Sequence, residues 1–167
     1  MIESLEMRRI MGRFLTGVTV VTAVDDDAAH GMTANSLTSV SLEPPLLLVC
    51  LASSARTTTA IVRSRRFGVS ILSARQERIA LRFAHRGTDH FAGLPLEHGR
   101  GFAVPVVPDA LAHVECAVEQ VVPAGDHQII VGRVDRLADR EGEPLGFLGG
   151  RFCAVADQSA PAPQWFY

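Results

Sequence analysis

The sequence contains no lysine, since all 16 basic residues among its 167 are arginine. Lysine Schiff-base chemistry and the phosphate-binding lysine of Walker-type loops are therefore excluded. The 16 basic and 18 acidic residues nearly cancel, leaving a formal net charge of −2. Such a balance provides no electrostatic attraction for nucleic acid or an anionic membrane surface, so we expect neither as a partner.

Cysteine and long apolar runs are also scarce. Cys50, Cys116 and Cys153 lie far apart in apolar stretches, without any CxxC pair. Thiols of this kind are typical of a reduced, cytoplasmic protein. The longest apolar run, residues 46–52, is too short to span a bilayer. The N-terminal stretch, with its two glutamates, does not resemble a secretory signal. A soluble cytoplasmic protein is the expectation.

Several catalytic signatures are missing from the sequence, including GxGxxG after a strand, GxSxG and HExxH. His90 and His98 lie with Asp89 in a predicted long loop, residues 86–110, and His85 immediately precedes this loop. Zinc binding is one interpretation of this group. Closed zinc sites require tight ligand pairs, however, so solvent-exposed loop histidines are the default expectation and no metal site is predicted.

Hydrophobic residues make up 47% of the chain, enough for the core of one domain. We assign residues 1–157 to that domain and residues 158–167, which end in Trp165, Phe166 and Tyr167, to a tail. Apolar spacing predicts an amphipathic helix over residues 7–14, with Ser4 as N-cap and Gly17 as terminator. Ser73 and Gln76 form a capping-box pattern ahead of a second helix. A third helix is predicted to begin near residues 56–58.

Strands are predicted from β-branched runs and from alternation of apolar and polar residues. In residues 112–119 Val114 and Cys116 should face the core, and Glu115 should face outward. Aspartates 25–27 and residues 123–126 are predicted turns, whereas Pro44-Pro45 should mark an edge or a break. The predicted strands cover residues 18–24, 67–72, 112–119, 128–134 and 147–155, with further strands between residues 31 and 52.

About six or seven strands with two or three short helices do not alternate as a βαβ fold would. The pattern favours a mainly β protein, namely a closed antiparallel barrel with appended helices.

Two segments carry residues suited to ligand binding. Small and hydroxylated residues concentrate in residues 31–41, where a purely structural strand would present large apolar groups. Residues 53–57 open a helix with hydroxyls and Arg56, an arrangement that cradles phosphate, although an N-capped helix explains it without a ligand. His127 follows a Gly-Asp turn, and turn chemistry does not require an imidazole there.

Together these segments resemble a known family. The ordered combination comprises GVTVVT at residues 17–22, GMTANS at 31–36 followed by Pro44-Pro45, FGVSIL at 67–72, DHFAG at 89–93, and GDH at 125–127 followed by Gly132. It is similar to the short-chain flavin reductases, the reductase components of two-component flavin-dependent monooxygenases. The resemblance covers residues 7–156.

The resemblance implies a split β-barrel with Greek-key-like antiparallel strands, which binds FMN or FAD at a homodimer interface. It implies hydride transfer from NADH or NADPH to the flavin, with His127 as the catalytic residue that places the nicotinamide. Reduced flavin would then pass to a partner monooxygenase. The implied cofactor-binding residues are Thr33, Ala34, Asn35, Ser36, Cys50, Leu51, Ala52, Ser53, Ala55, Arg56, Thr57, Phe91, Gly125, Asp126 and His127.

Two alternatives share the barrel. A pyridoxamine-phosphate-oxidase-like flavoenzyme is disfavoured, because such sites use lysines for phosphate and this chain has none. A non-catalytic flavin- or haem-binding protein is the other alternative.

Overall fold

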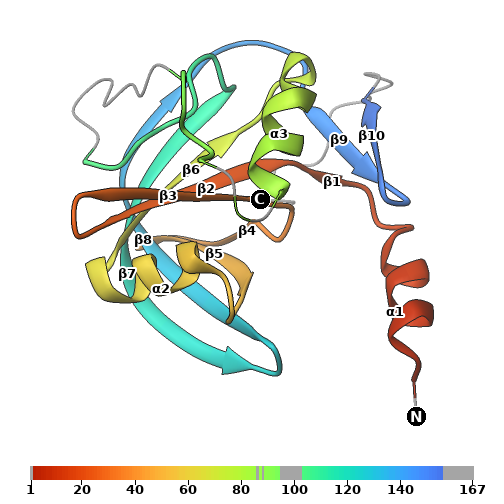
Figure 1. Ribbon diagram of the computed structural model, residues 1–167, viewed down its shortest axis with the longest axis horizontal. Coiled ribbons are helices and arrows are strands. Elements are labelled where there is room, and N and C mark those ends of the chain that lie inside the picture. The colour runs from red at the N-terminus through yellow and green to blue at the C-terminus, as the bar shows by residue number, and fades with distance from the viewer. Residues whose placement is uncertain (1, 86, 88, 95–102, 156–167) are drawn as a thin grey trace.

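Antiparallel strands dominate the computed structural model, which describes residues 2–85, 87, 89–94 and 103–155. The strands curl into a barrel with helices at its margins (Figure 1). The strands are β1 (Thr16–Gly17), β2 (Thr19–Asp25), β3 (Ala28–Ala34), β4 (Thr38–Leu42), β5 (Pro45–Ala52), β6 (Arg66–Ile71), β7 (Ala112–Ala124), β8 (His127–Asp139), β9 (Leu145–Leu148) and β10 (Arg151–Ala154). The helices are α1 (Ser4–Met11), α2 (Arg56–Ser64) and α3 (Glu77–Ala84), and the 3-10 turn η1 (Ala74–Gln76) precedes α3.

Seven strands form the main sheet in the order β3-β2-β6-β7-β8-β5-β4, and β1, β9 and β10 form a smaller one. The main sheet is open between its edge strands, β3 and β4, so the barrel is split rather than closed. Ser36 lies in the segment that connects β3 to β4, and its side chain ties this segment to β5. Its Oγ donates to the Cys50 carbonyl at 2.8 Å and accepts the Cys50 N–H at 3.0 Å. The mainly β class predicted from the strand pattern and the split β-barrel implied by the resemblance are confirmed, whereas the closed barrel that the pattern favoured is wrong and there are more strands than expected.

The barrel interior is packed by residues from opposite walls. Val21, Val49, Phe67, Val69 and Ile130 are all fully buried there. Each comes from a strand whose β-branched or aromatic side chains suit a half-buried pleated surface. A second cluster of buried residues lies under α3 and includes Leu72, Phe83 and Val107. These two cores fix the positions of α2 and α3 on the barrel.

Several local predictions hold. Residues 26 and 27 form the β2–β3 turn with φ values of 49° and 61°. Pro44-Pro45 lies at the turn into β5, where β4 is the edge of the sheet. Ser73 and Gln76 form the capping box, although it opens η1 rather than α3 directly. The hairpin at residues 123–128 is also present, and its strands are longer than the alternation indicated.

The N-terminal helix differs from its prediction. α1 runs from Ser4 to Met11 with Glu3 as N-cap residue and Gly12 as C-cap residue, so Ser4 is not the cap and Gly17 is not the terminator. Gly17 instead belongs to β1, which pairs with β9. None of the residues of α1 is buried, and Figure 1 shows the helix standing off from the barrel. No helix in the described part of the chain is long and apolar enough to cross a membrane.

The predicted single strand over residues 147–155 is instead a hairpin of β9 and β10. Gly149 and Gly150, with φ of 59° and 80°, make its two-residue turn, a conformation that glycine adopts without steric cost. The predicted tail, residues 158–167, lies outside the described residues, as do Trp165, Phe166 and Tyr167 and also His98 of the histidine group.

Glu115 also departs from the sequence prediction. Alternation placed its side chain outward, yet it is 1% exposed. The segment after residue 102 passes over it, and the Ala103 N–H donates to Oε2 at 2.8 Å while Arg66 pairs with Oε1. Burial of the carboxylate is therefore offset by a charged partner and a backbone donor, which strand periodicity cannot reveal.

Candidate active site

A cleft of about 880 Å³ lies along the free edge of β3, between α2 and α3. Every residue from 28 to 35 lines it. Consecutive strand residues point to opposite faces of a sheet, so a cleft that all of them line must run along the strand's edge. β3 pairs with β2 alone in the sheet order, which leaves the backbone N–H and C=O groups of its other edge available to a ligand.

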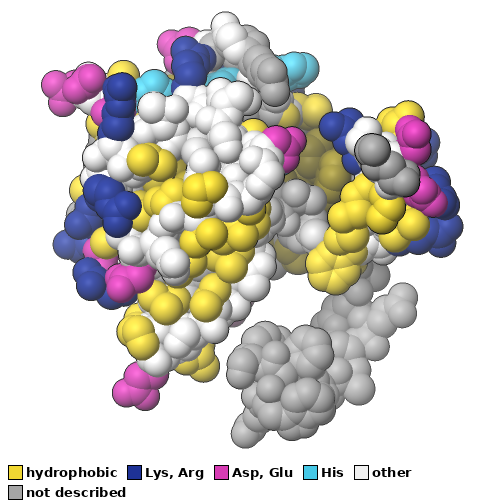
Figure 2. All heavy atoms as spheres, turned by 90° about the horizontal axis from the view of Figure 1, so that it is seen from below, with side chains coloured by type: hydrophobic (Ala, Val, Ile, Leu, Met, Phe, Trp, Pro, Cys, Tyr) yellow, Lys and Arg dark blue, Asp and Glu magenta, His cyan; other side chains and the backbone are white. Residues whose placement is uncertain are grey.

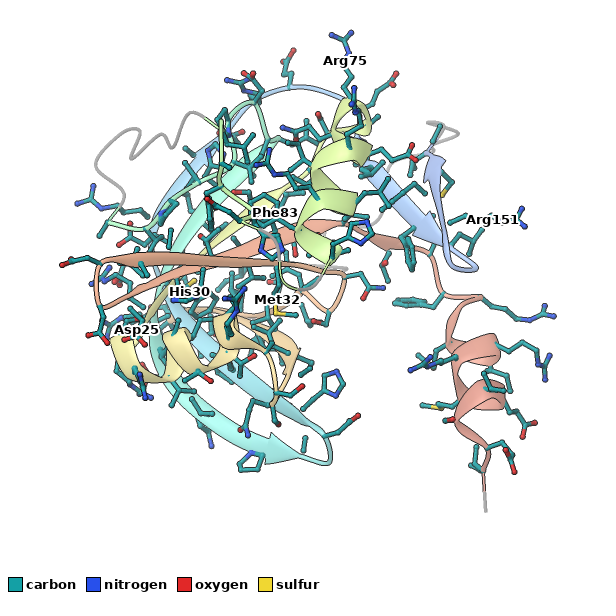
Figure 3. The ribbon with its side chains drawn as sticks, viewed as in Figure 1. Asp25, His30, Met32, Arg75, Phe83 and Arg151 are labelled. Atoms are coloured by element: carbon teal, nitrogen blue, oxygen red, sulfur yellow. The ribbon has the colours of Figure 1, made fainter. Side chains whose placement is uncertain are left out.

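The two faces of β3 meet different helices. Thr33 donates from Oγ1 to the Ala80 carbonyl of α3 at 2.6 Å, and Gly31 lies against Phe83 of the same helix. Met32 instead packs on the core cluster that contains Ile61 of α2. Figure 3 shows the same division, with His30 and Met32 on the α2 side of β3 and Phe83 on the α3 side.

Gly31 has a clear steric reason to be glycine. A Cβ at this position would lie 2.6 Å from Phe83 Cε1 and 3.0 Å from Phe91 Cζ. The two phenyl rings form an edge-to-face pair with centroids 5.1 Å apart. Glycine therefore lets an aromatic wall close directly onto the strand.

The N-terminus of α2 opens into the cleft through Ser54, Ala55, Arg56 and Thr57. Ala55 is the N-cap residue, and no side chain caps the helix. The first turn contains no acidic residue. Backbone N–H groups of a first turn have no partner within the helix, so this end attracts an anion, and Arg56 adds a guanidinium beside it.

The turn between β7 and β8 lies beside the end of β5. His127 is the strand partner of Ala52, which lines the cleft, and the Ser53 N–H donates to the Asp126 carbonyl at 2.9 Å. His127 Nδ1 lies 2.7 Å from Asp126 Oδ1. This hydrogen bond and the charge of the imidazole lower the pKa of Asp126. Gly125 makes the turn possible with φ of 62°.

The structure brings together about half of the predicted site residues. Those that line the cleft are Thr33, Ala34, Asn35, Ala52, Ala55, Arg56, Thr57 and Phe91. Ser36 and Cys50 lie behind the cleft, bonded to each other. Leu51 is 1% exposed, so its side chain belongs to the core. Ser53, Gly125, Asp126 and His127 flank the cleft at the start of β8.

Sequence reasoning missed further lining residues, among them His30, Met32, Phe83, Phe147 and Phe152. Phe83 and Met32 follow ordinary apolar spacing, which indicates burial and not a ligand-facing wall. Phe147 and Phe152 come from opposite strands of the β9–β10 hairpin and meet with ring centroids 5.6 Å apart. Their meeting depends on a hairpin that the sequence did not predict. Within the described ranges no group of His, Cys, Asp and Glu side chains could hold a metal ion.

Comparison with known proteins agrees with this geometry. A family model described as "Flavin reductase like domain" matches residues 11–156. An NADH-dependent flavin reductase from a Rhodococcus species is 42% identical over 159 residues, covering 90% of this chain and 86% of that protein. The reductase subunit HsaB of a flavin-dependent monooxygenase from Rhodococcus jostii is 37% identical over 164 residues, with 97% and 84% covered.

Among solved structures, the NADH:FAD oxidoreductase SgcE6 of Streptomyces globisporus C-1027, in complex with NAD and FAD fragments, superposes with a TM-score of 0.88. It is 38% identical in sequence, and the match covers 95% of this chain and 96% of that chain. The resemblance seen in the sequence motifs is confirmed.

Proposed function

The chain belongs to the family of flavin reductase-like domains and is an NAD(P)H-dependent flavin reductase, and we propose that the cleft along β3 is its active site. We further propose that NADH is the reductant, since similar proteins are named for it. The flavin, FMN or FAD, accepts the hydride that the nicotinamide supplies. The observation that carries the assignment of the site is the free edge of β3 beside an uncapped, arginine-bearing helix start.

The residues present fit a flavin. Its ring edge carries alternating hydrogen-bond donors and acceptors, and the open backbone of β3 offers groups that match them. Ala34 and Ala52 are small enough for a planar ring to approach the strands closely. At the start of α2, Arg56, Thr57 and the free N–H groups suit a phosphate.

Each group of predicted residues then has a defined task. Thr33, Ala34 and Asn35 lie along the ring and ribityl chain, and Ser36 holds Cys50 and thereby fixes β5 opposite them. Because the side chain of Leu51 is in the core, only its backbone is available to a ligand. Phe91 packs edge-to-face on Phe83, and the two rings form the aromatic wall of the cleft on the α3 side.

The proposed task of His127 is to place the nicotinamide. A carboxylate oxygen can only accept, so Nδ1 of His127 carries the hydrogen that binds Asp126. Nε2 is then the nitrogen available to a ligand. Gly125 and Asp126 set the position of the imidazole beside Ala52. Hydride transfer requires orientation of two rings rather than a general base, which agrees with this constellation.

A homodimer and a cytoplasmic location belong to the same proposal. α1 exposes large apolar side chains, among them Leu5 at 74% and Ile10 at 50%. In Figure 2 hydrophobic side chains gather on the lower face of the barrel and on the part of the molecule that carries α1, on two sides of a hollow. A second copy would cover both surfaces, and twofold pairing is the commonest arrangement. Three free cysteines suit a reducing compartment.

We propose that the product, reduced flavin, is delivered to a partner monooxygenase, and the support is that HsaB is named the reductase subunit of a flavin-dependent monooxygenase. The near balance of charges supports partners other than nucleic acid or membrane.

The decisive experiment measures NADH consumption in air by the purified protein, with and without added FMN or FAD. We expect consumption that saturates with flavin concentration, because free flavin is a substrate. Oxidation no faster than the uncatalysed background at saturating FMN and FAD would contradict the proposal. A yellow colour retained after desalting, without NADH oxidation, would point to a non-catalytic flavin-binding protein instead.

A further inference from the structure

Residues 89–94 form a compact turn that rests on α3 and borders the cleft. Within this turn, Oδ1 of Asp89 accepts the Phe91 N–H at 3.0 Å, and the Phe91 carbonyl accepts the Leu94 N–H at 3.0 Å. An aspartate that binds the backbone two residues further along is a common turn device. These bonds fix the shape of the turn, but they do not fix where the turn lies relative to the barrel.

Two ring contacts place the turn on α3. The centroid of the Phe83 ring lies 5.1 Å from that of Phe91 and 5.3 Å from that of His90. Phe83 is buried, whereas His90 and Phe91 are only partly buried. The hydrophobic part of such contacts has no preferred direction, so it brings the turn onto α3 without fixing its exact position. Directional bonds must supply the rest.

Arg82, in the last turn of α3, supplies directional bonds of this kind. Its Nη2 donates to the Ala92 carbonyl and, at 3.4 Å, to the Asp89 carbonyl. These two carbonyls lie on either side of Phe91 in the chain. A rigid, planar guanidinium that binds both of them therefore restrains the stretch of backbone from which the Phe91 side chain projects.

The position of Phe91 matters because its ring is part of the cleft wall and reaches β3. A Cβ on Gly31 would lie 3.0 Å from Phe91 Cζ, so the tip of the ring lies against the strand. Arg82 itself does not line the cleft, whereas Phe91 does. A displacement of the turn would change the space between the ring and the free edge of β3, although the guanidinium stays outside that space.

We propose that Arg82 is a positioning residue for flavin binding, which holds the carbonyls of Asp89 and Ala92 and thereby sets the position of the Phe91 ring against the flavin. The proposal rests on the proposed function, in which the cleft binds flavin and Phe91 forms part of its wall. Because the guanidinium acts through Phe91 and touches no reacting group, its loss should weaken the flavin complex equally in the ground state and the transition state.

Arg82→Gln removes the charged fork and keeps a polar side chain. We expect the KM for flavin to rise about three- to tenfold, toward the low end for loss of a charged hydrogen bond because Arg82 is only partly buried. The kcat at saturating flavin should be nearly unchanged. Steady-state kinetics and fluorescence titration with flavin measure both. Arg82→Met, which keeps the apolar stem and removes the donors, should show the same rise and serves if Arg82→Gln does not fold.

Arg78→Gln is the matched control. Arg78 is an exposed arginine about one turn earlier on α3, so its replacement removes the same charge from the same helix. The KM for flavin should equal that of the parent protein, because Arg78 makes no contact with the backbone of residues 89–94. A rise as large as that of Arg82→Gln would assign the effect to general attraction of the flavin phosphate and overturn the proposal.

A double-mutant cycle with Phe91 separates positioning from a merely structural role. In Phe91→Ala no ring remains to be positioned, so adding Arg82→Gln should raise the KM for flavin no further. The proposal is overturned if Arg82→Gln lowers the melting temperature without changing the KM for flavin, or if it raises that KM equally in both backgrounds. Failure of the proposed function is a different outcome, because the parent protein would then show no flavin-dependent NADH oxidation.

Discussion

His127 donates a hydrogen bond from Nδ1 to Oδ1 of Asp126 across 2.7 Å, although the two residues are neighbours in the chain. The side chain of Asp126 is 95% exposed and that of His127 is 44% exposed. The pair therefore does not pack in the hydrophobic core. Instead, the hydrogen bond holds the imidazole in one orientation beside Ala52. Such an arrangement suits a residue that must meet a ligand.

His127→Ala should lower kcat/KM for NADH by roughly tenfold to a hundredfold, as expected for loss of one buried hydrogen bond worth about 1–3 kcal/mol. Flavin affinity and melting temperature should be nearly unchanged, because the residue lies outside the core. Steady-state kinetics and thermal unfolding of one preparation measure both. Asp126→Asn should give a smaller kinetic loss, since it weakens only the orientation of the ring. A lower melting temperature with intact NADH kinetics would assign His127 to the hairpin alone.

Arg56→Ala should weaken flavin binding by about 1.5–3 kcal/mol, the range for a hydrogen bond to a charged group. Turnover at saturating flavin should change little, because a phosphate contact is equal in ground and transition states. Fluorescence titration gives the affinity, and steady-state kinetics give kcat. Arg63→Ala removes an exposed guanidinium from the other end of the same helix and serves as the control. A large fall in kcat with unchanged flavin affinity would refute this role for Arg56.

Gly31→Ala should destabilise the fold by roughly 1–3 kcal/mol, because its Cβ overlaps Phe83 and overpacking costs energy of this order. Displacement of Phe83 should also weaken flavin binding. Chemical denaturation and flavin titration are the measurements. Gly17→Ala is the matched control, since a Cβ there meets nothing within 4 Å. Equal stability of the two variants would show that Phe83 and Phe91 shift without cost to make room for the added methyl group.

The parent protein should have the mass of a dimer in light scattering. Ile10→Arg places a charge on the apolar face of α1 and should shift the protein toward monomer and reduce activity. Arg9→Ser, on the same helix, should leave the mass unchanged. A parent protein that is a fully active monomer at micromolar concentration would remove both the dimer and this role of α1.

Alkaline pH should destabilise the fold through Cys116. Burial, with the nearby charges of Asp135 and Glu115, raises the pKa of this thiol from 9.0 to about 12. Between these values the unfolded thiol loses its proton while the folded one keeps it, so stability falls as the pH rises through this window. Denaturant unfolding at a series of pH values measures the fall. In Cys116→Ala the fall should be smaller, and an identical pH dependence would exclude the thiol as its source.

The sequence by itself determined the strand-rich barrel, the capping box at Ser73 and the turn at residues 125 and 126. These features depend on local chemistry, namely alternation of apolar and polar residues, hydroxyl caps and glycine conformations. Each is set by residues that are close together in the sequence. The motif residues of the site were also visible, because small residues where a strand should be bulky are unusual in themselves.

Only the tertiary structure decided which of those residues share a cleft. Arg56 and Thr33 line one cleft because α2 and α3 pack on opposite faces of β3, whereas the side chain of Leu51 does not line it because it points into the core. Glu115 is buried by the segment at Ala103 and by its pairing with Arg66 of the neighbouring strand β6, and α1 remains exposed because nothing in the described chain covers its apolar face. Periodicity reports which side of an element is apolar. Contacts between elements distant in sequence decide what lies against that side, and the sequence pattern does not encode them locally.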